Sequence, residues 1–134
     1  MLHTYAIRLK PGQDLKLSIQ DFIRTNNIEA GWIVTAFGSL TDYHIRFANQ
    51  NAGQKAFGHF EILSLSGTLS IHGSHIHICI ADETGKTLGG HLLDDNIIYT
   101  TAEIIIQQSD KHIFLREPDE KTFWKELVIK EVQS

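Results

Sequence analysis

The sequence has few of the features that mark several common protein classes. Cys79 is the only cysteine among 134 residues, so no internal disulfide can form and no cysteine cluster can bind zinc. The apolar stretches are far shorter than the roughly 20 residues that cross a bilayer, and residues 1–5 (MLHTY) include no apolar signal-peptide region. These absences favour a cytoplasmic protein with no membrane partner.

Positive charge is also scarce. The chain has 12 Lys and Arg residues against 16 Asp and Glu residues, which gives a net charge of −4. Near the C-terminus, Lys121, Lys125 and Lys130 are interleaved with glutamates at 120, 126 and 131. Affinity for DNA depends on neutralising phosphates with clustered basic residues, so direct DNA binding is disfavoured.

The length and the even composition predict one domain covering residues 1–134, without repeats or a linker. Residues 2–9 are rich in strand formers, and residues 14–26 have apolar side chains at helical spacing behind the potential cap Asp14. Further strands are predicted at 29–37, 40–48, 57–72, 74–82, 86–93 and 97–108. Strands that follow one another through short turns pair antiparallel, so we expect an α+β fold built on a mostly antiparallel sheet.

Two segments have a less regular pattern. The alternation of apolar residues over 59–71 changes phase, which predicts a β-bulge near Leu63. Residues 118–132 are ambiguous, with a helical turn expected at 119–124 and a last strand at 127–132.

Histidine is unusually frequent in this sequence. Four of the eight histidines fall between positions 72 and 91. Residues 74–80 (SHIHICI) alternate, so that one face of a strand has the isoleucines and the other has His75, His77 and Cys79. This segment is therefore the first candidate for a metal-binding or catalytic site.

A turn that follows this strand fixes what lies opposite it. Residues 83–85 (ETG) form a typical three-residue hairpin loop between Asp82 and Lys86, with Gly85 in the left-handed position. Opposed residue numbers in an antiparallel pair keep a constant sum, so this register places His77 opposite His91 and brings His75 beside them.

Three neutral imidazoles with a free coordination position are a familiar arrangement for zinc, and nitrogen ligands also suit iron, nickel and copper. We therefore predict a divalent metal site, with zinc as the first candidate, on His75, His77 and His91. The alternative is that the two histidines of the 75–77 pair are only polar residues on a solvated face. His72 has the wrong parity and lies across Gly73, so it is left out of the site.

Glu103 is an acidic residue in an otherwise apolar strand. It could orient a ligating histidine or act as a general base beside metal-bound water. An edge or solvent-facing glutamate is the other interpretation, and the sequence leaves both open.

Together these segments resemble the plants-and-prokaryotes conserved (PPC) domain, which is known from plant AT-hook nuclear-localised proteins and from stand-alone prokaryotic proteins. The resemblance rests on an ordered set of motifs: residues 8–14 (RLKPGQD), 36–40 (AFGSL), 60–67 (FEILSLSG), 75–77 (HIH), 89–92 (GGHL) and 101–103 (TAE). It implies an antiparallel sheet flanked by helices, a homotrimer, and a metal held by His75, His77 and His91 at or near a subunit boundary. His59 stands where plant members have arginine in their partner-contact stretch, so those partners are not expected here.

Two functional hypotheses follow. The first is a homotrimeric, metal-binding PPC protein that acts as a regulatory or assembly module. The second is a metal-dependent hydrolase or lyase that acts on a small polar substrate at the open metal position, with Glu103 as a base candidate.

Prokaryotic PPC proteins are often labelled as predicted DNA-binding proteins, and this sequence argues against the label. It lacks the Arg-Gly-Arg-Pro hook of the plant proteins, and its interleaved charges cancel within a Debye length of about 8 Å at physiological salt. An anisotropy titration with duplex DNA at that salt is expected to show only weak, non-specific binding. Submicromolar affinity would contradict this expectation.

Overall fold

The computed structural model describes residues 1–133, and nearly all of its regular structure is β-sheet. Its elements are β1 (Leu2–Leu9), α1 (Leu15–Thr25), β2 (Gly31–Arg46), β3 (Gln54–Leu69), β4 (His75–Ala81), β5 (Thr87–Leu92), β6 (Ile97–Ser109), β7 (His112–Pro118) and β8 (Lys125–Glu131). Within residues 1–133, no helix has the length and hydropathy needed to cross a membrane.

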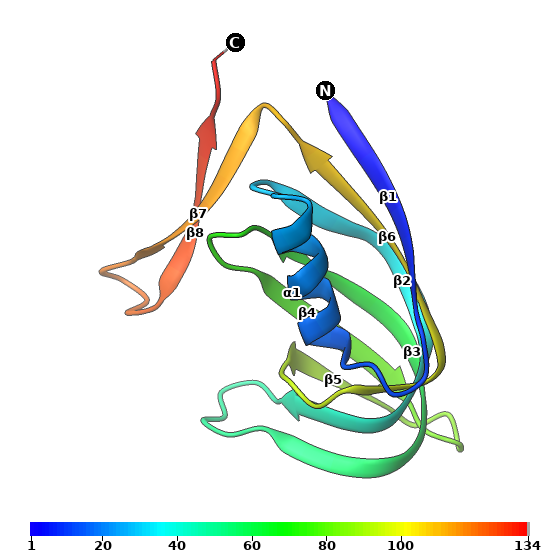
Figure 1. Cartoon of the computed structure of the whole chain (residues 1–134). Helices are drawn as coiled ribbons and strands as arrows, with labels where there is room; N and C mark the ends of the chain where they lie inside the picture. The colour runs from blue at the N-terminus through cyan, green and yellow to red at the C-terminus, as the bar shows by residue number, and fades with distance from the viewer. Residues whose placement is uncertain (134) are drawn as a thin grey trace.

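The main sheet has six antiparallel strands in the order β1-β6-β2-β3-β4-β5. The end of β2 also pairs with β5, where Arg46 lies opposite His91. This extra pairing curls β2, β3, β4 and β5 into a closed ring of strands. β7 and β8 form a separate two-stranded hairpin that stands to one side of the main sheet (Figure 1).

The one helix of residues 1–133, α1, lies across the inner face of the curved sheet (Figure 1). Asp14 begins it as predicted, because its Oδ1 accepts a hydrogen bond of 3.0 Å from the Leu17 backbone N–H. Leu15, Ile19 and Ile23 are buried and belong to the same core cluster as the inward-facing residues of the strands. The helix therefore closes the open side of the sheet.

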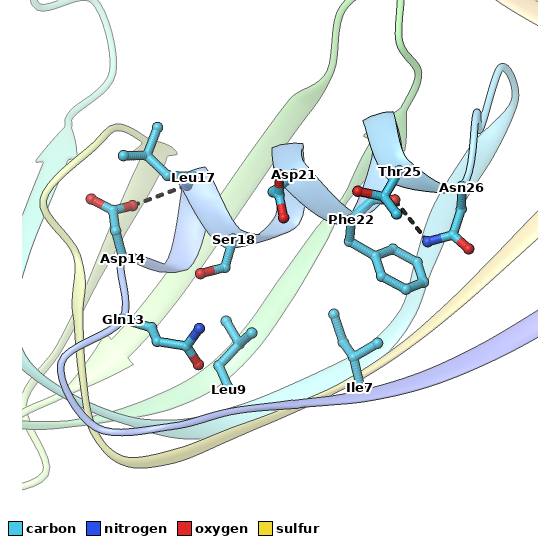
Figure 2. Close-up of a pocket in the computed structure, with 10 residues that line it drawn as sticks. All are labelled: Ile7, Leu9, Gln13, Asp14, Leu17, Ser18, Asp21, Phe22, Thr25 and Asn26. Atoms are coloured by element: carbon cyan, nitrogen blue, oxygen red, sulfur yellow. Dashed lines mark hydrogen bonds between the residues drawn. The ribbon is translucent and has the colours of Figure 1, made fainter.

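A groove of about 510 Å³ remains between α1 and β1 (Figure 2). Its walls are largely apolar, and both of its carboxylates are engaged. Asp14 caps the helix and also accepts from the Asp95 N–H, and Asp21 forms an ion pair of 2.6 Å with Arg24. The groove thus offers no free charged group for chemistry.

Most of the predicted elements are confirmed, but three are not as expected. In the described part of the chain only one helix packs against the sheet, so the expectation of several flanking helices is wrong. The predicted strands 29–37 and 40–48 form one strand, β2, because Gly38 and Ser39 continue the pairing with β3. β7 was not predicted as a strand. The helical turn expected at 119–124 is present in the connection from β7 to β8, where the Phe123 N–H donates to the Asp119 carbonyl four residues before it at 2.9 Å. The bulge near Leu63 is confirmed by a register shift between Ile62 and Ser64.

Asn96 is a fully buried polar residue that fastens the connection between β5 and β6 to β2. Its side-chain amide donates to the carbonyl oxygens of His44 and Leu93 at 2.9 and 2.8 Å, and its Oδ1 accepts from the His44 N–H at 3.0 Å. Three hydrogen bonds from one buried side chain therefore hold the end of β2 close to β5.

We expect Asn96→Ala to lower the free energy of unfolding by roughly 2–4 kcal/mol, because it removes three hydrogen bonds between a fully buried side chain and the backbone of His44 and Leu93. Urea denaturation followed by circular dichroism measures the change. Asn51→Ala removes the same atoms from an exposed residue and is expected to stay within about 0.5 kcal/mol of wild type. Equal stability of the two variants would contradict the role given to Asn96.

Candidate metal site

The turn between β4 and β5 is held by one aspartate. The Asp82 N–H donates to the Lys86 carbonyl at 2.9 Å, and the Gly85 N–H donates to the Asp82 carbonyl at 2.9 Å. Asp82 Oδ1 also accepts from the Thr84 N–H, the Thr84 hydroxyl and the Lys86 N–H. Gly85 has a φ of 85°, the left-handed conformation that the sequence predicted for it.

This turn gives the predicted register. His77 lies opposite His91, Cys79 lies opposite Gly89, and His75 is the next residue on the same face of β4. One candidate ligand nitrogen of each of the three histidines lies within 4.8 Å of the other two. The ring centroids of His75 and His77 are 4.7 Å apart, and those of His75 and His91 are 5.2 Å apart.

Small residues on the flanking strands allow this close packing. A Cβ atom at Gly67 would lie 2.1 Å from the His75 carbonyl oxygen, and one at Gly90 would lie 2.5 Å from the Arg46 carbonyl oxygen. The backbone of β3 therefore approaches β4 at His75, and the backbone of β2 approaches β5 beside His91.

Two of the three histidines, His75 and His91, favour the neutral form that binds metal. Burial, followed by the nearby Arg46 guanidinium, lowers the pKa of His91 to about 4. Burial and then the neighbouring His77 also lower the pKa of His75. Both rings are therefore unprotonated at neutral pH, and their nitrogen lone pairs are available.

The donor set suits a divalent ion such as zinc. Nitrogen ligands at about 2.0–2.1 Å from a tetrahedral zinc stand roughly 3.3 Å from one another, so small rotations of the rings would bring the observed nitrogens to that spacing. His75 and His77 are exposed and His91 is half-buried, which leaves room for a fourth ligand.

A cavity of about 630 Å³ opens beside His75 and His91. The end of β2 and the loop after it contribute Arg46 and three side-chain amides, and the β7–β8 hairpin contributes the opposite wall. Apart from Arg46, His75 and His91, the residues that line the cavity are Asn49, Gln50, Asn51, Ser74, Arg116, Trp124, Lys125 and Glu126. The candidate metal site is therefore one side of a larger cavity with a cationic lining.

Glu103 is not among these residues. It lies on β6 opposite Arg8 on one side and Phe37 on the other, whereas the histidines adjoin the far end of β2 at Arg46. The path along β2 from Phe37 to Arg46 is roughly 30 Å at about 3.3 Å per residue. Within one chain, the structure does not bring Glu103 to the histidines.

The five histidines that were left out of the site have partners of their own. They are His3 with Asp110 (3.5 Å), His44 with the Asp94 carbonyl (2.8 Å), His59 with Glu83 (3.4 Å), His72 with Glu29 (3.0 Å) and His112 with the Ser109 hydroxyl (2.7 Å). These local contacts account for them as structural or surface residues.

Sequence reasoning missed the residues across the cavity. The sequence analysis did not single out Arg46 or Arg116, and Trp124, Lys125 and Glu126 lie in the segment 118–132 that it found ambiguous. The pairing of β2 with β5 would have pointed to Arg46, but no turn joins those strands in sequence. We find no sequence signal that would have identified Arg116.

Several known proteins are similar to this chain in fold and in sequence. A protein of unknown function from Salmonella cholerae-suis is 37% identical, with a TM-score of 0.96 over 98% of this chain and 95% of that one. A protein from Archaeoglobus fulgidus that is described as metal-containing is 26% identical, with a TM-score of 0.81 over 94% of this chain and 93% of that one.

A curated relative from Synechococcus sp. (strain JA-3-3Ab), named bifunctional protein GlmU, is 43% identical over 131 residues. That match covers 98% of this chain but 21% of the relative, so the chain spans about a fifth of the length of the curated relatives it matches. The sequence model of one family matches residues 1–110, which include all three histidines. The chain belongs to the family of the Plants and Prokaryotes Conserved (PCC) domain, the PPC domain that its motifs resemble.

Proposed function

We propose that this PCC domain is a metal-dependent ligand-binding module. It holds one divalent ion, with zinc as the first candidate, on His75, His77 and His91, and it presents the remaining coordination position to the adjoining cavity. The observation that carries the proposal is the cluster of three nitrogens within 4.8 Å of one another. The metal-containing relative from Archaeoglobus fulgidus, 26% identical to this chain, supports it.

The role of a module, either regulatory or for assembly, agrees with two observations. In the longer curated relatives, a segment like this chain forms about a fifth of the whole protein. The three-histidine cluster also includes no carboxylate from residues 1–133 that could act as a base at the metal.

A metal-dependent hydrolase or lyase is the second candidate function, and the cavity beside the histidines favours it. Glu126 is the one carboxylate among the residues that line that cavity in the described chain, so it replaces Glu103 as the base candidate within one subunit. Turnover of a small ligand that stops on metal removal would favour the enzyme. Binding without turnover favours the module.

The metal site predicts close to one divalent ion per purified chain. We expect His77→Ala to weaken metal affinity by roughly 100-fold or more, since loss of even an outer partner of a ligand costs about 10–100-fold. Elemental analysis after dialysis measures the metal content. His72→Ala removes a nearby exposed histidine that pairs with Glu29 and is expected to leave the content unchanged. Metal retained by His77→Ala, or absent from wild type, would contradict the site.

We also propose that the protein is a homotrimer, in line with its family resemblance. Val34, Phe37, Leu63 and Tyr99 are exposed apolar residues on the outward side of β2, β3 and β6, and Phe37 is 53% exposed. Contiguous exposed apolar side chains favour association. In such an assembly, Glu103 beside Phe37 would lie at a subunit boundary, where it could approach the site of a neighbouring copy.

Light scattering is expected to give three times the chain mass of 15.2 kDa. Phe37→Asp should lower that mass, because it places a charge in the apolar patch. Leu17→Asp changes a similarly exposed residue on α1 and should leave the mass unchanged. A wild-type monomer at micromolar concentration would rule out the trimer.

A further inference from the structure

The cavity beside the three histidines has an arginine on either side of them. Arg46 lies directly opposite His91 across the β2–β5 pairing. Arg116 comes from β7 and donates from Nη2 to the Thr68 hydroxyl at 2.8 Å, and Thr68 lies directly opposite His75 across the β3–β4 pairing. Each guanidinium is therefore one strand away from a different histidine of the cluster.

These two arginines are not neutralised within the described chain. Acidic residues within 4.0 Å of a cation form seven ion pairs among residues 1–133, and neither Arg46 nor Arg116 takes part in one. The Nε of Arg116 is buried and has no hydrogen-bond acceptor. Lys125 adds a third cation to the lining, against the single carboxylate of Glu126. A buried donor without a partner and an excess of positive charge both call for an anion.

The rest of the lining suits an organic molecule more than a bare ion. A volume of about 630 Å³ is that of a small-molecule pocket. Asn49, Gln50 and Asn51 offer neutral hydrogen-bonding groups, and the Trp124 indole offers a flat apolar wall. The tight turn before Trp124 positions that wall, because the Asp119 N–H donates to the Trp124 carbonyl at 2.9 Å.

We infer that the cavity binds a small organic oxyanion, a carboxylate or a phosphate ester, whose charged group is held by Arg46 and Arg116 beside the histidine cluster. The planar guanidinium matches both kinds of oxyanion with paired hydrogen bonds. One oxygen of the same group would fill the free coordination position of the metal, so the inference rests on the proposed function for this second contact. The β7–β8 hairpin, which lies beyond the 1–110 match to the family, supplies Arg116 and Trp124 and hence determines ligand specificity.

The two tryptophan side chains give a local readout, since Trp124 lines the cavity and Trp32 lies on β2. Zinc-loaded full-length chain labelled with ¹⁵N is titrated with lactate and lactamide, and with glycerol 3-phosphate and glycerol, while the indole N–H signals are followed by NMR. Trp124→Phe assigns the signal. We expect a saturable shift of the Trp124 signal with at least one anion and none with either neutral analogue, and the tighter anion identifies the charged group.

Charge variants test the arginines. Arg46→Gln and Arg116→Gln should each weaken anion binding at least tenfold, whereas Arg24→Gln makes the same charge change on α1, at an arginine paired with Asp21, and should have no effect. Because Arg116 also anchors the hairpin to Thr68, Arg116→Lys provides a second variant that keeps the charge and should still bind more weakly. Equal binding of neutral and charged probes, or unchanged binding in Arg46→Gln, would overturn the inference.

Metal analysis of the same samples separates this inference from the proposed function. One ion per chain without any anion shift would overturn the oxyanion pocket and leave the metal site standing. No metal, with arginine-dependent anion binding to the metal-free chain, would overturn the metal site and support the ligand class.

Discussion

The register between β4 and β5 is the constraint on which the candidate site depends. Asp82 sets it with backbone and side-chain hydrogen bonds around the turn, and His77 faces His91 only in that register. A slip by one residue would move His91 to the other face of its strand and bury it among the isoleucines. The relative positions of the three histidines, which come from two strands, thus depend on a few hydrogen bonds in a turn that lies outside the site.

Electrostatics explains how the arginines and the histidines coexist. Charged imidazoles would repel Arg46 and Arg116. Burial first, and then repulsion by neighbouring positive groups, lowers the pKa of both His75 and His91, so these rings are neutral beside the arginines. A divalent ion among the histidines would add positive charge to a cavity that already has an excess of it. If the metal and the oxyanion both bind as proposed, each is expected to strengthen the binding of the other, because the negative group offsets the positive charge of the ion.

The sequence predicted the cluster of three histidines but not the cavity beside it, because the cluster depends on local sequence and the cavity does not. Residues 82–86 identify a turn, and a turn fixes the pairs beyond it, so His77 and His91 could be matched by counting. Arg46 reaches the site through a pairing between β2 and β5 that closes a ring of strands, and no local pattern reports such a closure. β7 escaped prediction because its residues 112–116 are all half-buried, without the alternation that marks a strand. Glu103 was singled out for its chemical type, but its place on β6 depends on the whole sheet.

The division of the cavity between two parts of the chain has an evolutionary consequence. The histidines lie inside the segment that matches the family, and Arg116 and Trp124 lie in a hairpin after it that hydrogen-bonds to the main sheet at few points, such as Thr68 and Ser70. Selection can replace such a hairpin without disturbing the register that aligns the three histidines. Homologues that keep the same histidines could then diversify in what they recognise by exchanging a single C-terminal segment.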